Sequence, residues 1–127
     1  PHAGKFGYMK DIVDLLNEAF GVDTPTILKA RVVNALADTV AGDDAARLQV
    51  RNSSNSKDAI VNEGRFRNII KEAAVGLRDN EFSSLATKVI NDPQSISPIA
   101  SLIYDLVKGQ KRIDIEDLKN YLDSQEQ

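Results

Sequence analysis

Apolar residues recur at steps of three and four along almost the whole chain, whereas the every-second-residue alternation of strands is nearly absent. Steps of three and four place apolar side chains on one face of an α-helix. Because such faces are stable only when they pack against each other, the pattern predicts an all-α fold, a compact bundle of six to eight short helices. At 127 residues, the chain is the size of one domain and can bury a core without a metal or a disulfide.

Cap and turn residues predict where each helix begins and ends. Short polar side chains cap helix N-termini, Pro suits the first helical position, and Gly suits the residue after the last. In the first half of the chain we predict a helix over residues 9–20 closed by Gly21, and a second helix that Thr24-Pro25 opens and Gly42 stops. A third helix covers residues 44–51, is capped by Asp43, and has Leu48 and Val50 among its apolar residues. The polar break Asn52–Ser56 follows, and a short helix is predicted from Ser56 to Val61.

The second half of the chain has the same kind of signals. The predicted helices are one from Gly64 to Leu77, one capped by Asp79 or Asn80 and ended by Asp92-Pro93, one opened by Ser97-Pro98 and closed by Gly109, and one from Asp114 as cap to about Leu122. Ile113 and Ile115 would also suit a strand, but the Asp114 cap favours the helix. The apolar stripes predict a core that contains Phe20, Leu36, Phe66, Ile70, Leu77, Phe82, Leu85 and Leu106.

The residue types present exclude several kinds of chemistry. The chain has no cysteine, which excludes disulfides, Cys-ligated metals and a thiol nucleophile, and is typical of a reducing, cytoplasmic compartment. Its one histidine, His2, lies near the chain start, so histidine acid–base catalysis and multi-histidine metal sites are not expected. Gly4-Lys5 is followed by Phe6 and does not form a phosphate-binding P-loop.

Neighbouring carboxylates stand near predicted helix starts, where negative charge complements the helix dipole. The pairs are Asp11/Asp14, Asp43-Asp44 and Glu116-Asp117, and we interpret them as caps rather than as an acid–base or metal site. The sequence therefore predicts no catalytic, cofactor-binding or metal-binding residue in this chain. No apolar run approaches the roughly 20 residues of a membrane span, so we expect a soluble domain without a membrane partner.

Positive charge is concentrated in the middle of the chain. Residues 47–78 hold seven basic and three acidic side chains, a net of +4, whereas residues 1–46 carry −3 and residues 79–127 carry −4. On the helix predicted from Gly64, the spacing of Arg67, Lys71 and Arg78 places all three on one side. With Arg65 they are the candidate contacts to DNA phosphates or to a protein partner.

Two other interpretations of this basic segment stay open. It could be a solvent-exposed helix face, or an inter-subunit surface that meets acidic residues. The sequence pI of about 5.1 argues against nucleic acid as the main ligand of the whole domain. In the domain organisation we expect, residues 1–8 are a linker or a remnant of cloning, because the only methionine is Met9, and residues 9–127 form a single C-terminal helical domain of a longer protein.

Several short motifs resemble one protein family in order and spacing. Asp11–Gly21, with its Leu-Asn-Glu-Ala-Phe-Gly ending, resembles the helix that opens the C-terminal helical region of type I restriction enzyme R subunits. Val33-Asn34-Ala35-Leu36 is similar to that family's next helix, and Asn52–Asp58 resembles its Asn-Ser-Lys-acid turn, although Ala59-Ile60 replaces the usual Gln-Phe. Phe66–Leu77 falls where the family has its following apolar helix, so the resemblance covers roughly residues 9–110.

The resemblance implies a role in a larger machine. R subunits are ATP- and Mg²⁺-dependent DNA translocases and site-specific deoxyribonucleases whose catalytic motifs lie in earlier domains, so it assigns no catalytic residue here. It implies that this region packs on the motor and helps dock it to the methyltransferase and specificity subunits, and that it meets duplex DNA through the parent protein. The alternatives are a free-standing helical DNA-binding module that uses the basic segment 47–78, and a small regulatory adaptor without a motor.

Overall fold

The computed structural model describes residues 7–51 and 63–125 of the chain. Within these residues it contains seven α-helices and no strand, so the all-α prediction is confirmed. The helices are α1 (Gly7–Phe20), α2 (Thr26–Gly42), α3 (Asp44–Arg51), α5 (Glu63–Val75), α6 (Ser83–Asn91), α7 (Pro93–Lys108) and α8 (Ile115–Gln125). The predicted polar break and the short helix from Ser56 to Val61 lie outside the described residues.

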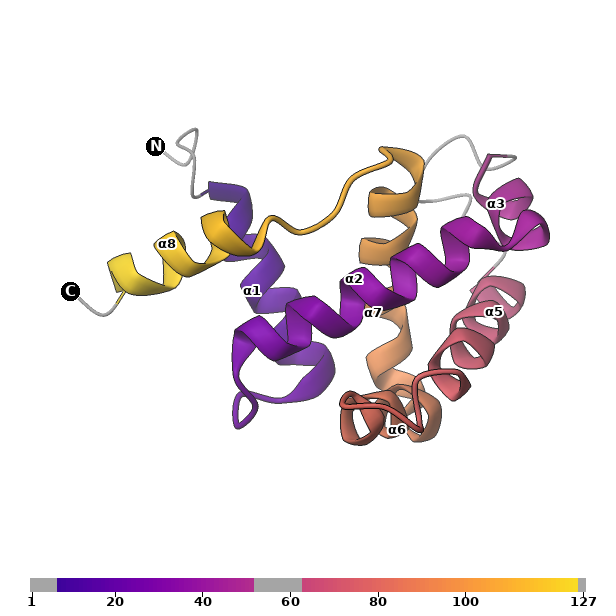
Figure 1. The fold of residues 1–127 in the computed structure, drawn as a ribbon, viewed down its shortest axis with the longest axis horizontal. Helices are drawn as coiled ribbons and strands as arrows, with labels where there is room; N and C mark the ends of the chain where they lie inside the picture. Colours follow the sequence, from indigo (N-terminus) through magenta and orange to yellow (C-terminus); the bar gives the residue numbers. More distant parts are fainter. Residues whose placement is uncertain (1–6, 52–62, 126–127) are drawn as a thin grey trace.

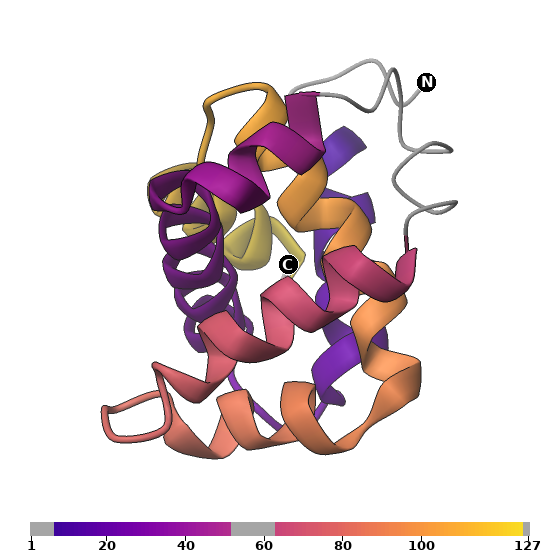
Figure 2. The same cartoon turned by 90° about the vertical axis from the view of Figure 1, so that its right-hand side faces the viewer.

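Helix α7 is the centre of the bundle. It packs against α1, α2, α3, α5 and α6, and Figure 1 shows α2 crossing in front of it. Helices α1 and α8 lie together at one end of the molecule, and α3 and α5 lie at the other. Figure 2 looks onto this second end, where α5 lies in front of α7 and α6 runs along the lower edge. One long apolar helix thus provides a packing surface for most of the others.

The core is built from the apolar stripes that the sequence predicts. Six of the eight predicted core side chains are buried, namely Phe20, Leu36, Phe66, Ile70, Leu85 and Leu106. The ring of Phe66 meets Tyr104 edge-on, with 6.4 Å between the ring centroids. The other two, Leu77 and Phe82, are half-buried and pack against the core from the turn that joins α5 to α6. They are less buried because neither lies inside a helix.

Three of the predicted helix ends are confirmed in their hydrogen bonding. Gly21 has a φ of +87°, and its N–H donates to the carbonyl of Asn17 at 2.8 Å, which closes α1. The Asp43 carboxylate accepts from the Ala46 N–H at 2.9 Å at the start of α3. The Asp114 carboxylate accepts from the N–H groups of Glu116 and Asp117, at 2.9 and 3.2 Å, at the start of α8.

Three predicted starts are wrong. Helix α2 begins at Thr26 with Pro25 as its N-cap residue, one position later than predicted. Helix α6 begins at Ser83 with Phe82 as its N-cap residue, so neither Asp79 nor Asn80 caps it. Helix α7 begins at Pro93, not at Pro98, because the Asp92 carboxylate accepts from the Gln94 N–H at 3.0 Å and caps the helix earlier. Pro98 therefore lies inside α7, where its missing N–H removes one backbone hydrogen bond that the packing of the helix must offset.

Smaller differences concern the ends of the chain and α3. Residues 7 and 8, which were predicted to precede the domain, belong to α1, and α8 continues three residues beyond Leu122 to Gln125. Leu48 of α3 is 56% exposed, while Val50 is buried, because only one side of this short helix faces the bundle. Among the helices described here, none has both the length and the apolar character that crossing a membrane requires.

Candidate interaction surfaces

The four candidate contact residues lie on α5 and in the turn that follows it. Arg67 and Lys71 are one helical turn apart on α5, and both side chains are half-buried. Arg65, two residues before Arg67, is exposed on another side of the same helix. Arg78 is exposed but lies beyond the end of α5. The structure therefore brings together Arg67 and Lys71, whereas Arg65 lies on another side of α5 and Arg78 lies outside that helix.

The predicted three-cation stripe is wrong at Arg78 because α5 ends at Val75. Gly76 follows, and a glycine inside a helix costs about 1 kcal/mol relative to alanine. The backbone then tightens into a turn in which the Leu77 N–H donates to Ala74 at 3.0 Å and the Arg78 N–H donates to Val75 at 3.2 Å. The helical spacing on which the stripe was based does not continue through these residues.

A second basic surface lies at the other side of α7, where this helix ends against α2 and α3. It is a groove of about 720 Å³, which we call the α2–α7 groove. Its lining residues are Ala37, Asp38 and Ala41 of α2, Arg47 and Val50 of α3, and Leu106, Val107, Lys108, Gln110, Lys111 and Arg112 at and after the end of α7. Four of these side chains are basic and one is acidic.

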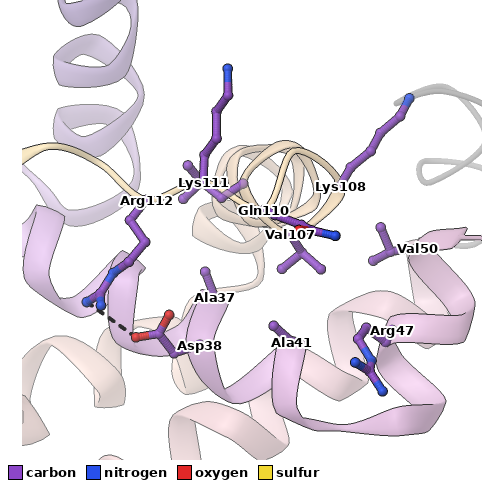
Figure 3. A pocket seen from close by; sticks show the side chains of 11 residues that line it. Ala37, Asp38, Ala41, Arg47, Val50, Val107, Lys108, Gln110, Lys111 and Arg112 are labelled. Atoms are coloured by element: carbon purple, nitrogen blue, oxygen red, sulfur yellow. Dashed lines mark ion pairs between the residues drawn. The ribbon is translucent and has the colours of Figure 1, made fainter.

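The groove has an apolar floor and a charged rim. Figure 3 shows the short side chains of Ala37, Ala41 and Val107 directed toward the space between the helices, with Val50 at its far side. Lys108 and Lys111 extend away from the floor. The charged rim is therefore accessible from solvent, while the floor is formed by small apolar groups.

The shape of the groove depends on how α7 ends. The Gln110 N–H donates to the carbonyl of Val107 at 3.2 Å, and the Lys111 N–H donates to that of Leu106 at 2.8 Å. This is a Schellman motif, and Gln110 occupies its left-handed position with a φ of +51°. Gly109, the residue that the sequence suggests for this end, is the C-cap with an ordinary φ of −84°. The sharp reversal brings the chain back toward α2, where Arg112 reaches Asp38.

Two of the rim cations have carboxylate partners at the surface. The Arg112 guanidinium lies 3.3 Å from the Asp38 carboxylate, the ion pair marked in Figure 3. The Arg47 guanidinium lies 2.7 Å from the Asp44 carboxylate. All four side chains are at least half exposed, and ion pairs of this kind contribute about 0–1 kcal/mol. An incoming carboxylate can replace such a partner at small cost.

Lys108 has a different contact. Its ammonium group lies 5.5 Å from the centroid of the Tyr104 ring, a cation–π arrangement along one side of α7. It also complements the negative end of the α7 dipole. Burial raises the pKa of Asp105, and Lys108 acts on that carboxyl in the opposite direction.

Sequence reasoning missed three of the four groove cations. Lys108, Lys111 and Arg112 lie within residues 79–127, whose net charge of −4 conceals them when the chain is cut into long segments. A signal was present, since the run Lys-Gly-Gln-Lys-Arg places three cations within five residues directly after an apolar helix. Only the fold shows that Arg47, distant in sequence, joins them.

A buried lysine was also missed. Lys29 of α2 is 0% exposed, and its ammonium group donates to Asn17 Oδ1 of α1 at 2.7 Å. Burial lowers its pKa, partly offset by the nearby carboxylate of Asp23 and reinforced by Lys88. Lys88 of α6 in turn donates to the carbonyl of Phe20 at 2.9 Å. Two lysines from different helices thus bind the C-terminal end of α1, where the helix dipole is negative.

The first two motifs of the family resemblance lie at junctions between helices, and Asn52–Asp58 lies outside the described residues. Asn17, Phe20 and Gly21 make the contacts at the end of α1 just described, and Asn34 of α2 bonds to the backbone of Ile113. Within the described residues, there is no group of three or more His, Cys, Asp or Glu side chains that could hold a metal ion. No protein-family model matches the chain, and neither a curated protein nor a solved structure shows significant similarity to it.

Proposed function

We propose that this chain is the C-terminal helical domain of a type I restriction enzyme R subunit and that it acts as a docking domain. In this proposal it packs on the ATP-dependent DNA translocase and nuclease and attaches it to the methyltransferase and specificity subunits. ATP and Mg²⁺ are used by the parent protein, and the chain itself contributes no catalytic group. Duplex DNA is then a partner of the parent.

The observation that carries the proposal is what the motif residues do in the fold. In the Leu-Asn-Glu-Ala-Phe-Gly motif, Leu16 and Phe20 are buried, Asn17 accepts a hydrogen bond from Lys29, and Gly21 takes the left-handed conformation. Asn34, from the second motif, is buried and bonds to Ile113 across the bundle. Buried positions, side-chain hydrogen bonds between helices and a left-handed glycine restrict the residue type more than an ordinary helical position does. Matches at such positions support the resemblance more than matches of general helix-forming residues do.

The docking role has a direct test in the full R subunit. Residues 9–127 are deleted, and assembly with the methyltransferase and specificity subunits is measured by sedimentation velocity. We expect weaker assembly while the ATPase activity of the motor domains persists. Unchanged assembly affinity contradicts the docking role.

The candidate contacts on α5 have their own test. Charge reversal of Arg67, Lys71 and Arg78 is made in the same full subunit, with Lys119→Glu on the exposed side of α8 as the matched control. If these cations meet acidic protein surface, the triple variant loses assembly and the control does not. If neither variant changes assembly, the three residues are solvent-exposed cations without a docking role.

The absence of catalysis in the chain is tested separately. We expect the purified chain to hydrolyse neither ATP nor DNA in the presence of Mg²⁺. Turnover that disappears when one residue of the chain itself is substituted would contradict this part of the proposal.

A second candidate function is a helical DNA-binding module, which the distribution of basic residues favours. The described cations of the segment 47–78 lie on α3, on α5 and in the turn after α5, and they are Arg47, Arg51, Arg65, Arg67, Lys71 and Arg78. The acidic flanks oppose DNA, because charges within a Debye length of about 8 Å act on the same phosphates. We expect the chain to bind duplex DNA no better than about 10⁻⁴ M at physiological salt. Micromolar binding with a steep salt dependence, lost in the triple charge-reversal variant, would favour the DNA-binding module.

A further inference from the structure

We infer that the α2–α7 groove is a docking site for an acidic amphipathic helix of a protein partner. The inference rests on the groove alone and does not depend on which complex the chain belongs to.

The cations that line the groove come from separate parts of the chain, and Figure 3 shows their charged ends on different sides of it. Arg47 comes from α3, Lys108 from the last turn of α7, and Lys111 and Arg112 from the segment that follows. Complementing the α7 dipole accounts for Lys108 but does not explain Arg47, which belongs to a different helix. With Asp38 as the one acidic lining residue, the rim carries a net positive charge in a chain whose total is −3.

The floor indicates a protein ligand rather than a nucleic acid. The small side chain of Ala41 on α2 lets another helix approach closely, whereas Ala37, one turn before it, is already buried in the bundle. Ala41 and Val107 are half-exposed, so part of this apolar surface is in contact with water and is buried only when a partner binds. DNA phosphates would contact the rim and leave the floor uncovered, whereas the apolar face of a helix would cover it.

The ion pairs of the groove suit the same occupant. Asp38 and Asp44 pair with two of the four rim cations, Arg112 and Arg47, and both ion pairs are exposed. A glutamate of the partner can take either place with little loss, because exposed pairs are weak. An acidic helix with a short apolar face matches both the floor and the rim.

The test uses the whole chain and a synthetic probe. The probe is a fluorescein-labelled peptide of about four helical turns with leucine and alanine on one face and glutamate elsewhere. A matched peptide carries lysine in place of each glutamate. Fluorescence anisotropy is expected to show the acidic peptide binding at least about tenfold more tightly than the basic one.

Variants then locate the binding. Arg47→Glu combined with Lys111→Glu is expected to weaken binding of the acidic peptide by about tenfold or more, while Lys119→Glu, a charge reversal on α8 away from the groove, changes it by less than about twofold. Ala41→Trp fills the floor and is expected to abolish peptide binding with the helical circular dichroism unchanged. If Ala41→Trp binds the acidic peptide as well as the original chain does, attraction is purely electrostatic and the inference is wrong.

Two further measurements identify other occupants. If a duplex oligonucleotide binds more tightly than the acidic peptide, and this binding is lost in the variant that combines Arg47→Glu with Lys111→Glu, the groove is a phosphate site. If the chain dimerises in sedimentation velocity and Ala41→Trp makes it monomeric, the occupant is a second copy. Either result overturns the inference, as does the absence of saturable binding of the acidic peptide at about 1 mM.

Discussion

Asn34 and Ile113 exchange two hydrogen bonds across the bundle. Asn34 Nδ2 donates to the Ile113 carbonyl at 3.1 Å, and the Ile113 N–H donates to Asn34 Oδ1 at 2.8 Å. Both residues are buried, and they are 79 positions apart in the chain. One amide side chain in the middle of α2 thus satisfies the backbone of the segment that leads into α8, a segment that has no helix or sheet of its own to do so.

Asn34→Ala is expected to lower the free energy of unfolding by about 2–5 kcal/mol. The substitution leaves a buried N–H and a buried carbonyl of Ile113 without their partner, and each such group costs about 1–3 kcal/mol. Urea denaturation followed by circular dichroism measures the change, with Asn120→Ala on the exposed side of α8 as the control. A loss no larger than that of the control contradicts the role assigned to Asn34.

Ile70→Ala is expected to lower stability by about 2–5 kcal/mol, because the side chain is 0% exposed and its removal leaves a cavity in the core. Val75→Ala on the same helix is the matched control, since that side chain is 52% exposed. A loss below about 1 kcal/mol for Ile70→Ala would show that α5 packs on the bundle through another face.

Gln110→Gly is expected to stabilise the chain by about 1 kcal/mol, because a non-glycine residue in the left-handed region is strained. Gly21→Ala is expected to have the opposite effect, since its φ is +87° and an added Cβ would lie 2.9 Å from Asp23 Oδ1. Gly42→Ala is the control: nothing lies within 4 Å of its Cβ position. Thermal unfolding should rank the three variants in the order Gln110→Gly, Gly42→Ala and Gly21→Ala.

Lys29→Met is expected to change how stability depends on pH. Burial lowers the pKa of Lys29 below its ordinary value of 10.5, so just below that pH the unfolded chain binds more protons than the folded one. The contribution of Lys29 to stability therefore rises with pH in this window. The difference between Lys29→Met and the original chain should shift in favour of the original chain as the pH rises toward 10.5.

The control for this prediction is Lys119→Met on the exposed side of α8. Its stability should follow that of the original chain across the same pH range. Parallel curves for Lys29→Met and the original chain would contradict the lowered pKa of Lys29. Urea denaturation at each pH provides the measurement.

The prediction of individual elements succeeded where the determining interactions are local. Gly21, Asp43 and Asp114 mark helix ends because each acts on backbone groups within four residues. It failed where two local signals compete. Asp92-Pro93 and Ser97-Pro98 are both valid helix starts, and the sequence does not show that α7 passes through Pro98. Packing of α7 in the middle of the bundle decides between them.

The helical class, most of the core and the basic middle segment follow from the sequence, because periodicity, capping and charge are properties of residues close together in the chain. The packing of the helices is needed to show that Arg78 lies beyond the end of α5, that Lys29 and Asn34 are buried at helix junctions, and that Arg47 lines one groove with Lys108, Lys111 and Arg112. These relationships join residues up to 79 positions apart. They depend on how whole helices pack, and a local pattern along the chain does not record that packing.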